Sequence, residues 1–136
     1  MEFLKKENEL EDVVSYIKNI AKNGGIFLLR GDLASGKTTL VKAFAKFLGI
    51  KDDVSSPTFS ILNIYEDKIY HYDIYNKGVG EFVSMGLLET LEESGYHFIE
   101  WADEKLENIL KEYGFGYFII EIESKGDKRV YRITNA

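Results

Sequence analysis

Eight consecutive residues, Gly31-Asp32-Leu33-Ala34-Ser35-Gly36-Lys37-Thr38, match the phosphate-loop pattern G-x-x-x-x-G-K-[ST] at every fixed position. The two glycines let the backbone curl so that successive N–H groups point at phosphate oxygens, and the N-terminus of a following helix adds partial positive charge. Lys37 would reach the β- and γ-phosphates, and the Thr38 hydroxyl would bind Mg²⁺. The pattern therefore predicts a nucleoside triphosphate site rather than a glycine-rich turn with an exposed lysine.

Two acidic residues stand where a phosphate-loop enzyme needs a carboxylate, at the ends of predicted strands. Asp73 ends the aromatic stretch Ile69-Tyr70-His71-Tyr72-Asp73, and Glu100 ends the apolar stretch Tyr96-His97-Phe98-Ile99-Glu100. Each carboxylate is predicted to hold magnesium or to orient a nucleophile; a rim residue or a helix cap is the alternative. The two histidines lie inside strand-like stretches, which favours buried, hydrogen-bonded histidines over catalytic ones.

A polar loop holds Ser55-Ser56-Pro57-Thr58, between the second predicted helix and the next strand. A threonine in this interval senses the γ-phosphate in many phosphate-loop switch proteins, so Thr58 is a candidate sensor; a simple Ser-Pro turn is the alternative. Asn76-Lys77-Gly78-Val79 begins like the guanine-reading N-K-x-D element but lacks its aspartate, which favours ATP over GTP. The basic turn near Lys128 is either a solvated surface or an edge facing nucleotide or RNA.

Composition limits the other classes of function. The chain has 136 residues, a net charge of −6 and no cysteine. We expect one domain over residues 1–136, because this length is typical of a single domain. Thiol chemistry and cysteine-based metal sites are excluded. The excess of acidic residues disfavours a protein that grips nucleic acid by phosphate neutralisation alone. The sequence has neither a signal-peptide stretch nor a membrane span, which predicts a cytoplasmic protein that does not bind membranes.

Strands and helices alternate along the first part of the chain, and a hairpin closes it. We expect a helix from about Asn8, where Asn8 and Glu11 resemble a capping box. The other predicted elements are a buried strand over 26–29, a helix after the phosphate loop that ends at Gly49, strands over 59–65 and 69–75, a short helix within 81–91, a buried strand over 96–99, a helix capped by Asp103 and a hairpin over 117–134. This pattern predicts an α/β fold: a three-layer, P-loop NTPase-like domain with a mixed, largely parallel sheet and a C-terminal β-hairpin.

Together these motifs resemble the bacterial TsaE (YjeE) family of small ATPases, which are required for making threonylcarbamoyladenosine in tRNA. The motifs that carry the resemblance are, in order, Gly31-Asp32-Leu33 leading into Gly36-Lys37-Thr38-Thr39, then Ser56-Pro57-Thr58-Phe59, His71-Tyr72-Asp73-Ile74-Tyr75 and Phe98-Ile99-Glu100-Trp101. The chain departs from the family at Ala34-Ser35, where Gly-Ala is usual, and at Asn76, where an arginine is common. A Cβ at position 34 restricts the backbone of the loop.

The resemblance implies a role for each matching residue. Thr38 and Glu100 would bind Mg²⁺, Thr58 would sense the γ-phosphate, and Asp73 would position water or metal. Glu7 would face the adenine, and the hairpin near Lys128 would cover the same base. The phosphates of ATP would be held by Asp32, Leu33, Ala34, Ser35, Gly36, Lys37, Thr38 and Thr39.

The resemblance also implies a partner. The protein would bind the TsaB–TsaD transferase complex, with tRNA reached only indirectly, and would reset that complex by Mg-ATP binding and hydrolysis. Hydrolysis by the protein alone would be weak. Two other hypotheses use the same loop: a small-molecule kinase, and a non-catalytic, ATP-gated assembly factor. The sequence leaves the oligomeric state open.

Overall fold

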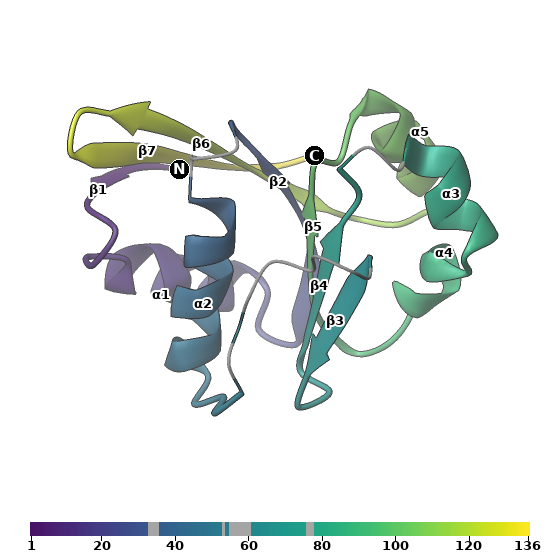
Figure 1. The fold of residues 1–136 in the computed structure, drawn as a ribbon, viewed down its shortest axis with the longest axis horizontal. Coiled ribbons are helices and arrows are strands. Elements are labelled where there is room, and N and C mark those ends of the chain that lie inside the picture. Colours follow the sequence, from purple (N-terminus) through teal and green to yellow (C-terminus); the bar gives the residue numbers. More distant parts are fainter. Residues whose placement is uncertain (33–35, 53, 55–60, 76–77) are drawn as a thin grey trace.

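The described strands of the protein form one mixed sheet. The computed structural model describes residues 1–32, 36–52, 54, 61–75 and 78–136. Its strands are β1 (Glu2–Lys5), β2 (Gly24–Arg30), β3 (Leu62–Tyr65), β4 (Ile69–Asp73), β5 (Gly95–Glu100), β6 (Phe118–Lys125) and β7 (Lys128–Asn135). They are arranged in the order β1-β7-β6-β2-β5-β4-β3 (Figure 1). Among the described residues, no helix is long and apolar enough to cross a bilayer.

The direction of the strands changes from the centre of the sheet to its edges. The four central strands β6, β2, β5 and β4 pair in parallel, whereas β1–β7, β7–β6 and β3–β4 pair antiparallel. The sheet is therefore mixed with a parallel centre, as the sequence predicts. Because the central strands run the same way, their carboxyl ends meet at one edge, where ligands bind in open α/β sheets.

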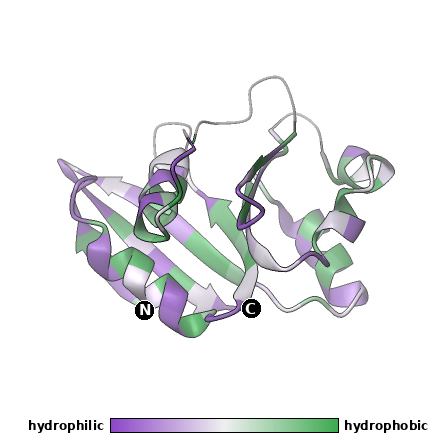
Figure 2. Cartoon of the chain, turned by 90° about the horizontal axis from the view of Figure 1, so that it is seen from below, coloured by the Kyte–Doolittle hydropathy of each residue, from purple (hydrophilic) through white to green (hydrophobic). Residues whose placement is uncertain are grey.

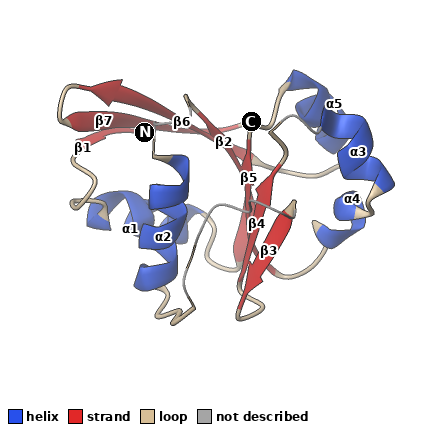
Figure 3. Cartoon of the chain, in the orientation of Figure 1, coloured by secondary structure: helices blue, strands red, loops and turns tan. Residues whose placement is uncertain are grey.

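Helices cover both faces of the sheet, so the fold has three layers (Figure 3). One face packs against α1 (Glu11–Ile20) and α2 (Lys37–Phe47), and the other against α3 (Gly78–Ser84), α4 (Leu87–Thr90) and α5 (Glu104–Glu112). Successive side chains of β2 point to opposite faces of the sheet. Phe27 and Leu29 therefore pack in the core under α1 and α2, and Leu28 packs in the core under α3, α4 and α5. A strand buried on both faces needs apolar residues at every position, which explains the apolar sequence of β2 and the green central strands in Figure 2.

The predicted start of the first helix is wrong. Helix α1 begins at Glu11, and the preceding Leu10 makes no side-chain cap. Glu9 instead accepts a hydrogen bond from the backbone of Lys6 at 3.1 Å. The reason is a strand that the sequence did not predict: β1 pairs antiparallel with β7, and residues 6–9 must turn the chain from this edge strand into the helix. Tertiary pairing has overridden the local capping signal.

The single helix expected within 81–91 is also wrong in detail, because the chain forms two short helices there. Gly86 lies between α3 and α4 with φ +76°, a backbone conformation that interrupts a right-handed helix. Other predicted boundaries are confirmed. Gly49, with φ +78°, follows the end of α2, and the Asp103 carboxylate accepts a hydrogen bond from Leu106 N at 3.0 Å.

Candidate functional site

Three sequence-predicted segments meet at the carboxyl edge of the parallel strands. In the register of the sheet Leu29 lies opposite Glu100, and Glu100 lies opposite Asp73. The chain leaves β2 through Gly31 and enters α2 after Gly36, so the phosphate loop begins at the edge of the sheet where both carboxylates lie. The tertiary structure therefore brings together residues about 70 positions apart in the chain. Leu33, Ala34 and Ser35 lie outside the described residues, and so does Thr58.

The start of α2 provides polar groups for an anion. Gly36 has φ +100° and precedes the first residue of the helix. The first backbone N–H groups of any helix lack partners within the helix, and a glycine at this position has no side chain with which to cap them. The positive end of the helix dipole is therefore directed toward the edge of the sheet that carries Glu100 and Asp73.

Lys37 is a buried cation, with 3 % of its surface exposed. Its ammonium donates hydrogen bonds to the carbonyl oxygens of Gly31 and Asp32, each at 2.8 Å. It also lies 4.1 Å from the centre of the Trp101 ring, within cation–π range. Burial lowers the pKa of Lys37 below its ordinary value, and the carboxylates of Glu100, Asp32 and Asp73 oppose that shift.

Trp101 holds its ring over Lys37 in an uncommon backbone conformation. Its φ of +67° is in the left-handed region, which a bulky residue adopts only when its surroundings impose it. The ring also contacts Tyr75, at 4.8 Å between ring centroids. In the sequence Trp101 stands out only as the last residue of the motif Phe98-Ile99-Glu100-Trp101, and the structure gives it a direct contact with the phosphate-loop lysine.

The Glu100 carboxylate is buried and joined to Thr38. The Thr38 hydroxyl donates a hydrogen bond to Glu100 Oε2 at 2.9 Å, and the same oxygen contacts Nε2 of His71. Both predicted magnesium ligands are therefore in direct contact. His71 is fully buried and hydrogen-bonded, as predicted for the two histidines, but its contact with a candidate metal ligand was missed. Its position two residues before Asp73 indicates that both side chains share one face of the strand, but the contact with Glu100 depends on the register between β4 and β5.

Asp73 lies at the end of β4, half-buried, and its Oδ1 accepts a hydrogen bond from the backbone N–H of Tyr75 at 3.0 Å. This Asx-type turn fixes the carboxylate where the strand ends. Burial lowers the pKa of Lys37, and the negative charge of Asp73 partly opposes that shift, so the two side chains share one electrostatic environment.

Arg30, the residue before Gly31, connects the carboxyl edge of the parallel strands to helix α5. Its guanidinium pairs with Glu107 and donates to the Ala102 carbonyl at 3.3 Å, and the Tyr117 hydroxyl donates to Glu107 at 2.8 Å. Burial opposes ionisation of Glu107, but hydrogen bonds from Arg30 and Tyr117 lower its pKa overall. Burial and the bond to Glu107 raise the pKa of Tyr117 to about 12.

The C-terminal hairpin reaches the phosphate loop through Arg129. A Cβ built on Gly36 would lie 2.4 Å from Arg129 Nη1, so the guanidinium lies directly against this glycine. Arg129 also pairs with Glu7 at 3.6 Å, which brings the predicted adenine-facing residue to the same place. Lys128 is exposed, and its predicted role stays a prediction. The sequence pointed to the basic hairpin and singled out Lys128 rather than Arg129, because only strand register decides which of two adjacent basic residues faces the loop.

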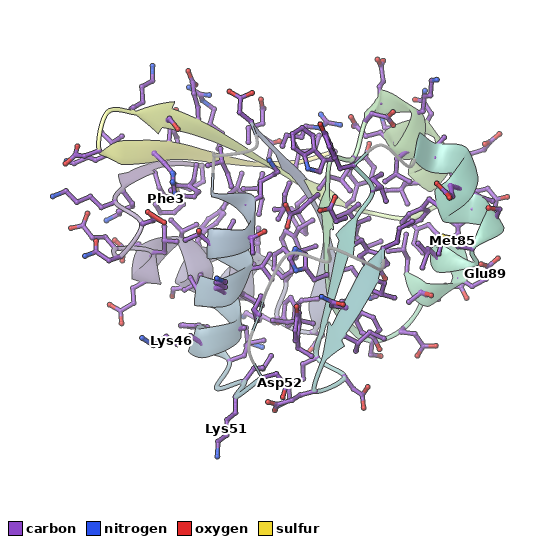
Figure 4. All side chains as sticks on the ribbon, viewed as in Figure 1. Phe3, Lys46, Lys51, Asp52, Met85 and Glu89 are labelled. Atoms are coloured by element: carbon purple, nitrogen blue, oxygen red, sulfur yellow. The ribbon has the colours of Figure 1, made fainter. Side chains whose placement is uncertain are left out.

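An open groove of about 860 Å³ runs between the segment before α1 and the outer side of α2. Glu7, Asn8 and Leu10 line one wall; Thr39, Ala43 and Phe47 line the other. Lys46 also lines the groove, from the outward surface of α2 (Figure 4). The volume is within the range of small-molecule sites, and Thr39 connects the groove to the phosphate loop.

The residues fit Mg²⁺ and a nucleoside triphosphate. Thr38 and Glu100 supply hard oxygen donors, the kind that Mg²⁺ prefers, and Mg²⁺ usually takes its remaining ligands from phosphates and water. Lys37 and the start of α2 supply positive charge for phosphates. The groove beside Glu7 can hold a nucleoside.

Comparison with known proteins identifies the family. The family model for TsaE, described as threonylcarbamoyl adenosine biosynthesis protein TsaE, matches residues 4–132. The tRNA threonylcarbamoyladenosine biosynthesis protein TsaE of Bacillus subtilis is 36% identical over 117 residues, which are 78% of this chain and 73% of that protein. The protein of the same name from Aquifex aeolicus is 34% identical, over 95% of this chain and 93% of that protein.

A solved structure agrees with these sequence matches. The crystal structure of Bacillus subtilis YdiB superposes with a TM-score of 0.72 at 29% identity, covering 99% of this chain and 84% of that one. The fold, the arrangement of motifs and the extent of the matches agree with one another. The chain therefore belongs to the TsaE family of threonylcarbamoyladenosine biosynthesis proteins.

Proposed function

We propose that this TsaE family member is a magnesium-dependent ATPase that supports threonylcarbamoyladenosine modification of tRNA by binding and resetting the TsaB–TsaD transferase complex. The observation that carries the ATPase proposal is the contact between Thr38 and Glu100, 2.9 Å from hydroxyl to carboxylate, directly after the buried ammonium of Lys37. A hydroxyl, a carboxylate and a lysine at the start of a helix match the requirements of phosphoryl transfer to water.

The residues divide into those that bind phosphate and those that bind metal. Lys37 and the backbone N–H groups at the start of α2 would bind phosphate oxygens, while Thr38 and Glu100 would hold Mg²⁺. Bound Mg²⁺ would neutralise charge on the phosphates and help to align them for attack by water. Asp73, half-buried at the same edge of the sheet, would orient that water, and Thr58 would sense the γ-phosphate.

The nucleoside of ATP would lie at the groove beside Glu7. The groove opens from Thr39, which would contact the phosphates, and Glu7 carboxylate oxygens can accept hydrogen bonds from an exocyclic amine. An amine of this kind is present on adenine at the position where guanine has a carbonyl, so Glu7 favours ATP. Arg129, paired with Glu7, would close the same end of the site from the hairpin.

Resetting a partner requires a part of the protein that responds to nucleotide. Lys37 bonds the Gly31 and Asp32 carbonyls and lies under Trp101, so engagement of phosphate by Lys37 must exchange these contacts. Trp101 in turn contacts Tyr75, which is 46% exposed. A change at Lys37 can therefore be transmitted to the surface through two aromatic rings, and a partner that prefers one arrangement would couple to ATP.

A reconstituted modification reaction tests this proposal. Purified TsaB, TsaD, tRNA and threonylcarbamoyl donor are combined with this protein, and phosphate release and modified tRNA are measured together. We expect weak hydrolysis by the protein alone, stimulation by the transferase complex, and repeated modification cycles only with hydrolysable ATP. Repeated cycles with a non-hydrolysable ATP analogue would refute resetting by hydrolysis, and phosphate transfer to a small-molecule acceptor would indicate a kinase.

A further inference from the structure

His71 is a buried histidine of β4 on the face of the sheet that carries the site. None of its surface is exposed. It lies opposite Phe98 in the register between β4 and β5, and Asp73, two residues further along the strand, lies opposite Glu100. Alternation along the two strands therefore directs His71 and Asp73, and Phe98 and Glu100, to one face.

Among the described residues, the ring nitrogens of His71 have one hydrogen-bond partner, the Glu100 carboxylate. Its Nε2 contacts Glu100 Oε2, and because a carboxylate only accepts hydrogen bonds, Nε2 carries the hydrogen. Its Nδ1 is buried and has no hydrogen-bond partner among the described residues. A buried polar atom without a partner is destabilising and is uncommon in folded proteins, so packing alone does not explain a histidine at this position.

His97, the second buried histidine of the sheet, has the contacts expected of a histidine with a purely structural role. His97 uses both ring nitrogens: Nδ1 contacts the Tyr72 hydroxyl at 2.7 Å, and Nε2 contacts the Glu93 carbonyl at 2.8 Å. Neither partner belongs to the candidate site. The two buried histidines therefore form an internal comparison, in which only His71 contacts a candidate metal ligand.

Two donors meet at Glu100 Oε2, and they differ in how firmly each is held. The Thr38 hydroxyl belongs to the first turn of α2, next to the loop that must accommodate phosphate. The imidazole of His71 projects from β4, a strand paired on both sides with β5 and β3, so its position does not depend on the loop. His71 can therefore hold the carboxylate in place whichever partner Thr38 engages.

We propose that His71 is a positioning residue that orients the Glu100 carboxylate for Mg²⁺, a role that rests on the proposed ATPase function. A hydrogen bond to the side chain that binds a metal fixes the orientation of that ligand, and loss of such a bond typically lowers metal affinity by about 10- to 100-fold. The relevant group is the N–H at Nε2. A substitution that keeps a donor there should keep metal affinity, and one that removes the donor should not.

Two amide substitutions separate these cases. In His71→Gln the side-chain NH₂ lies close to the position of Nε2, whereas in His71→Asn it lies close to Nδ1 and does not reach Glu100. ATP affinity is measured by calorimetry with Mg²⁺ and again in EDTA, and Mn²⁺ binding to the ATP complex is measured by electron paramagnetic resonance. We expect His71→Asn to lower the affinity for Mn²⁺ by about 10- to 100-fold, and to reduce by a similar factor the increase in ATP affinity that Mg²⁺ produces. The ATP affinity measured in EDTA should stay unchanged. We expect His71→Gln to restore most of this loss.

His97→Gln is the matched control, because it also replaces a buried histidine of the sheet, whose ring nitrogens contact Tyr72 and the Glu93 carbonyl rather than a described site residue. It should leave the effect of Mg²⁺ on ATP affinity unchanged. Equal metal affinity in His71→Asn and His71→Gln, or an equal loss of ATP affinity with and without metal, would overturn the role of His71. If the wild-type protein binds no ATP under either condition, the proposed function fails and this role fails with it. If Mg²⁺ raises the ATP affinity of the wild-type protein and both His71 variants keep the same gain, the positioning role alone is refuted.

Discussion

Replacing Gly36 by alanine tests whether the phosphate loop and the C-terminal hairpin form one packed unit. Gly36 has φ +100°, and an added Cβ would lie 2.4 Å from Arg129 Nη1 and 2.9 Å from Arg129 Cζ. The backbone at this position is unfavourable for any residue with a Cβ, and the guanidinium must move. That movement would disturb the ion pair between Arg129 and Glu7, whose charged atoms are 3.6 Å apart.

Two terms set the size of the effect. A non-glycine residue held in a sparsely populated backbone region costs about 1–3 kcal/mol. The Arg129–Glu7 pair contributes at most about 1 kcal/mol, because Glu7 is 59% exposed and surface ion pairs are weak. The free energy of unfolding should therefore fall by about 1–4 kcal/mol, most of it from the backbone. Gly49→Ala is the matched control: Gly49 lies at the other end of α2 with φ +78°, and no described residue has an atom within 4 Å of an added Cβ.

Urea unfolding, followed by the fluorescence of Trp101, the single tryptophan, measures these changes. Each glycine variant is made in the wild-type protein and in Arg129→Ala. We expect the loss caused by Gly36→Ala to shrink by about 0.5–1 kcal/mol when Arg129 is absent, since residues in contact are not additive. The loss caused by Gly49→Ala should be the same in both backgrounds. A Gly36→Ala loss that does not depend on Arg129 would refute the contact between hairpin and loop.

Three further predictions concern single side chains. Lys37→Ala should abolish ATP hydrolysis in a phosphate-release assay while the circular dichroism spectrum stays unchanged, because it removes the cation that faces the phosphates; retained turnover would contradict its role. Glu100→Ala should abolish hydrolysis and lower the free energy of unfolding by about 1–3 kcal/mol, since Thr38 and His71 lose their acceptor. Full activity in this variant would refute the metal assignment. Burial lowers the pKa of His97 below its ordinary 6.5, so the unfolded chain binds a proton that the folded chain does not, and stability should fall as the pH drops below about 6.5. Thermal unfolding of the wild-type protein and of His97→Gln should be measured across this pH range. The free energy of unfolding should fall more steeply with decreasing pH in the wild type, by at most about 1.4 kcal/mol per pH unit. Equal pH dependence in the two proteins would contradict the prediction.

Local patterns were sufficient to predict most of the elements. The apolar stretch over 26–29 predicted a strand buried on both faces, and β2 is one. The Asp103 cap and the Gly49 stop were also correct, because capping depends on a few neighbouring residues. Strand β1 was missed because an edge strand of four residues is defined by its partner β7, which lies more than 120 positions away in the chain.

The candidate site was predicted as a list of residue types and assembled only by the sheet. The motif around Lys37 predicted chemistry from its spacing, since the pattern of glycines, lysine and threonine is itself the requirement for binding phosphate. No local pattern predicted that His71 contacts Glu100, or that Arg129 lies against Gly36. Both contacts depend on the register between strands that are distant in sequence.

The sequence by itself determined the phosphate loop, the two strand-end acids, the alternation of elements and, through four motifs in order, the resemblance to the TsaE family. These are properties of neighbouring residues, and backbone geometry within a few residues is enough to define them. The tertiary structure decided which side chains meet: His71 with Glu100, Trp101 with Lys37 and Arg129 with Gly36. The physical reason is that a shift of one residue in strand pairing moves every side chain to the opposite face, and that pairing is selected by the packing of both cores together.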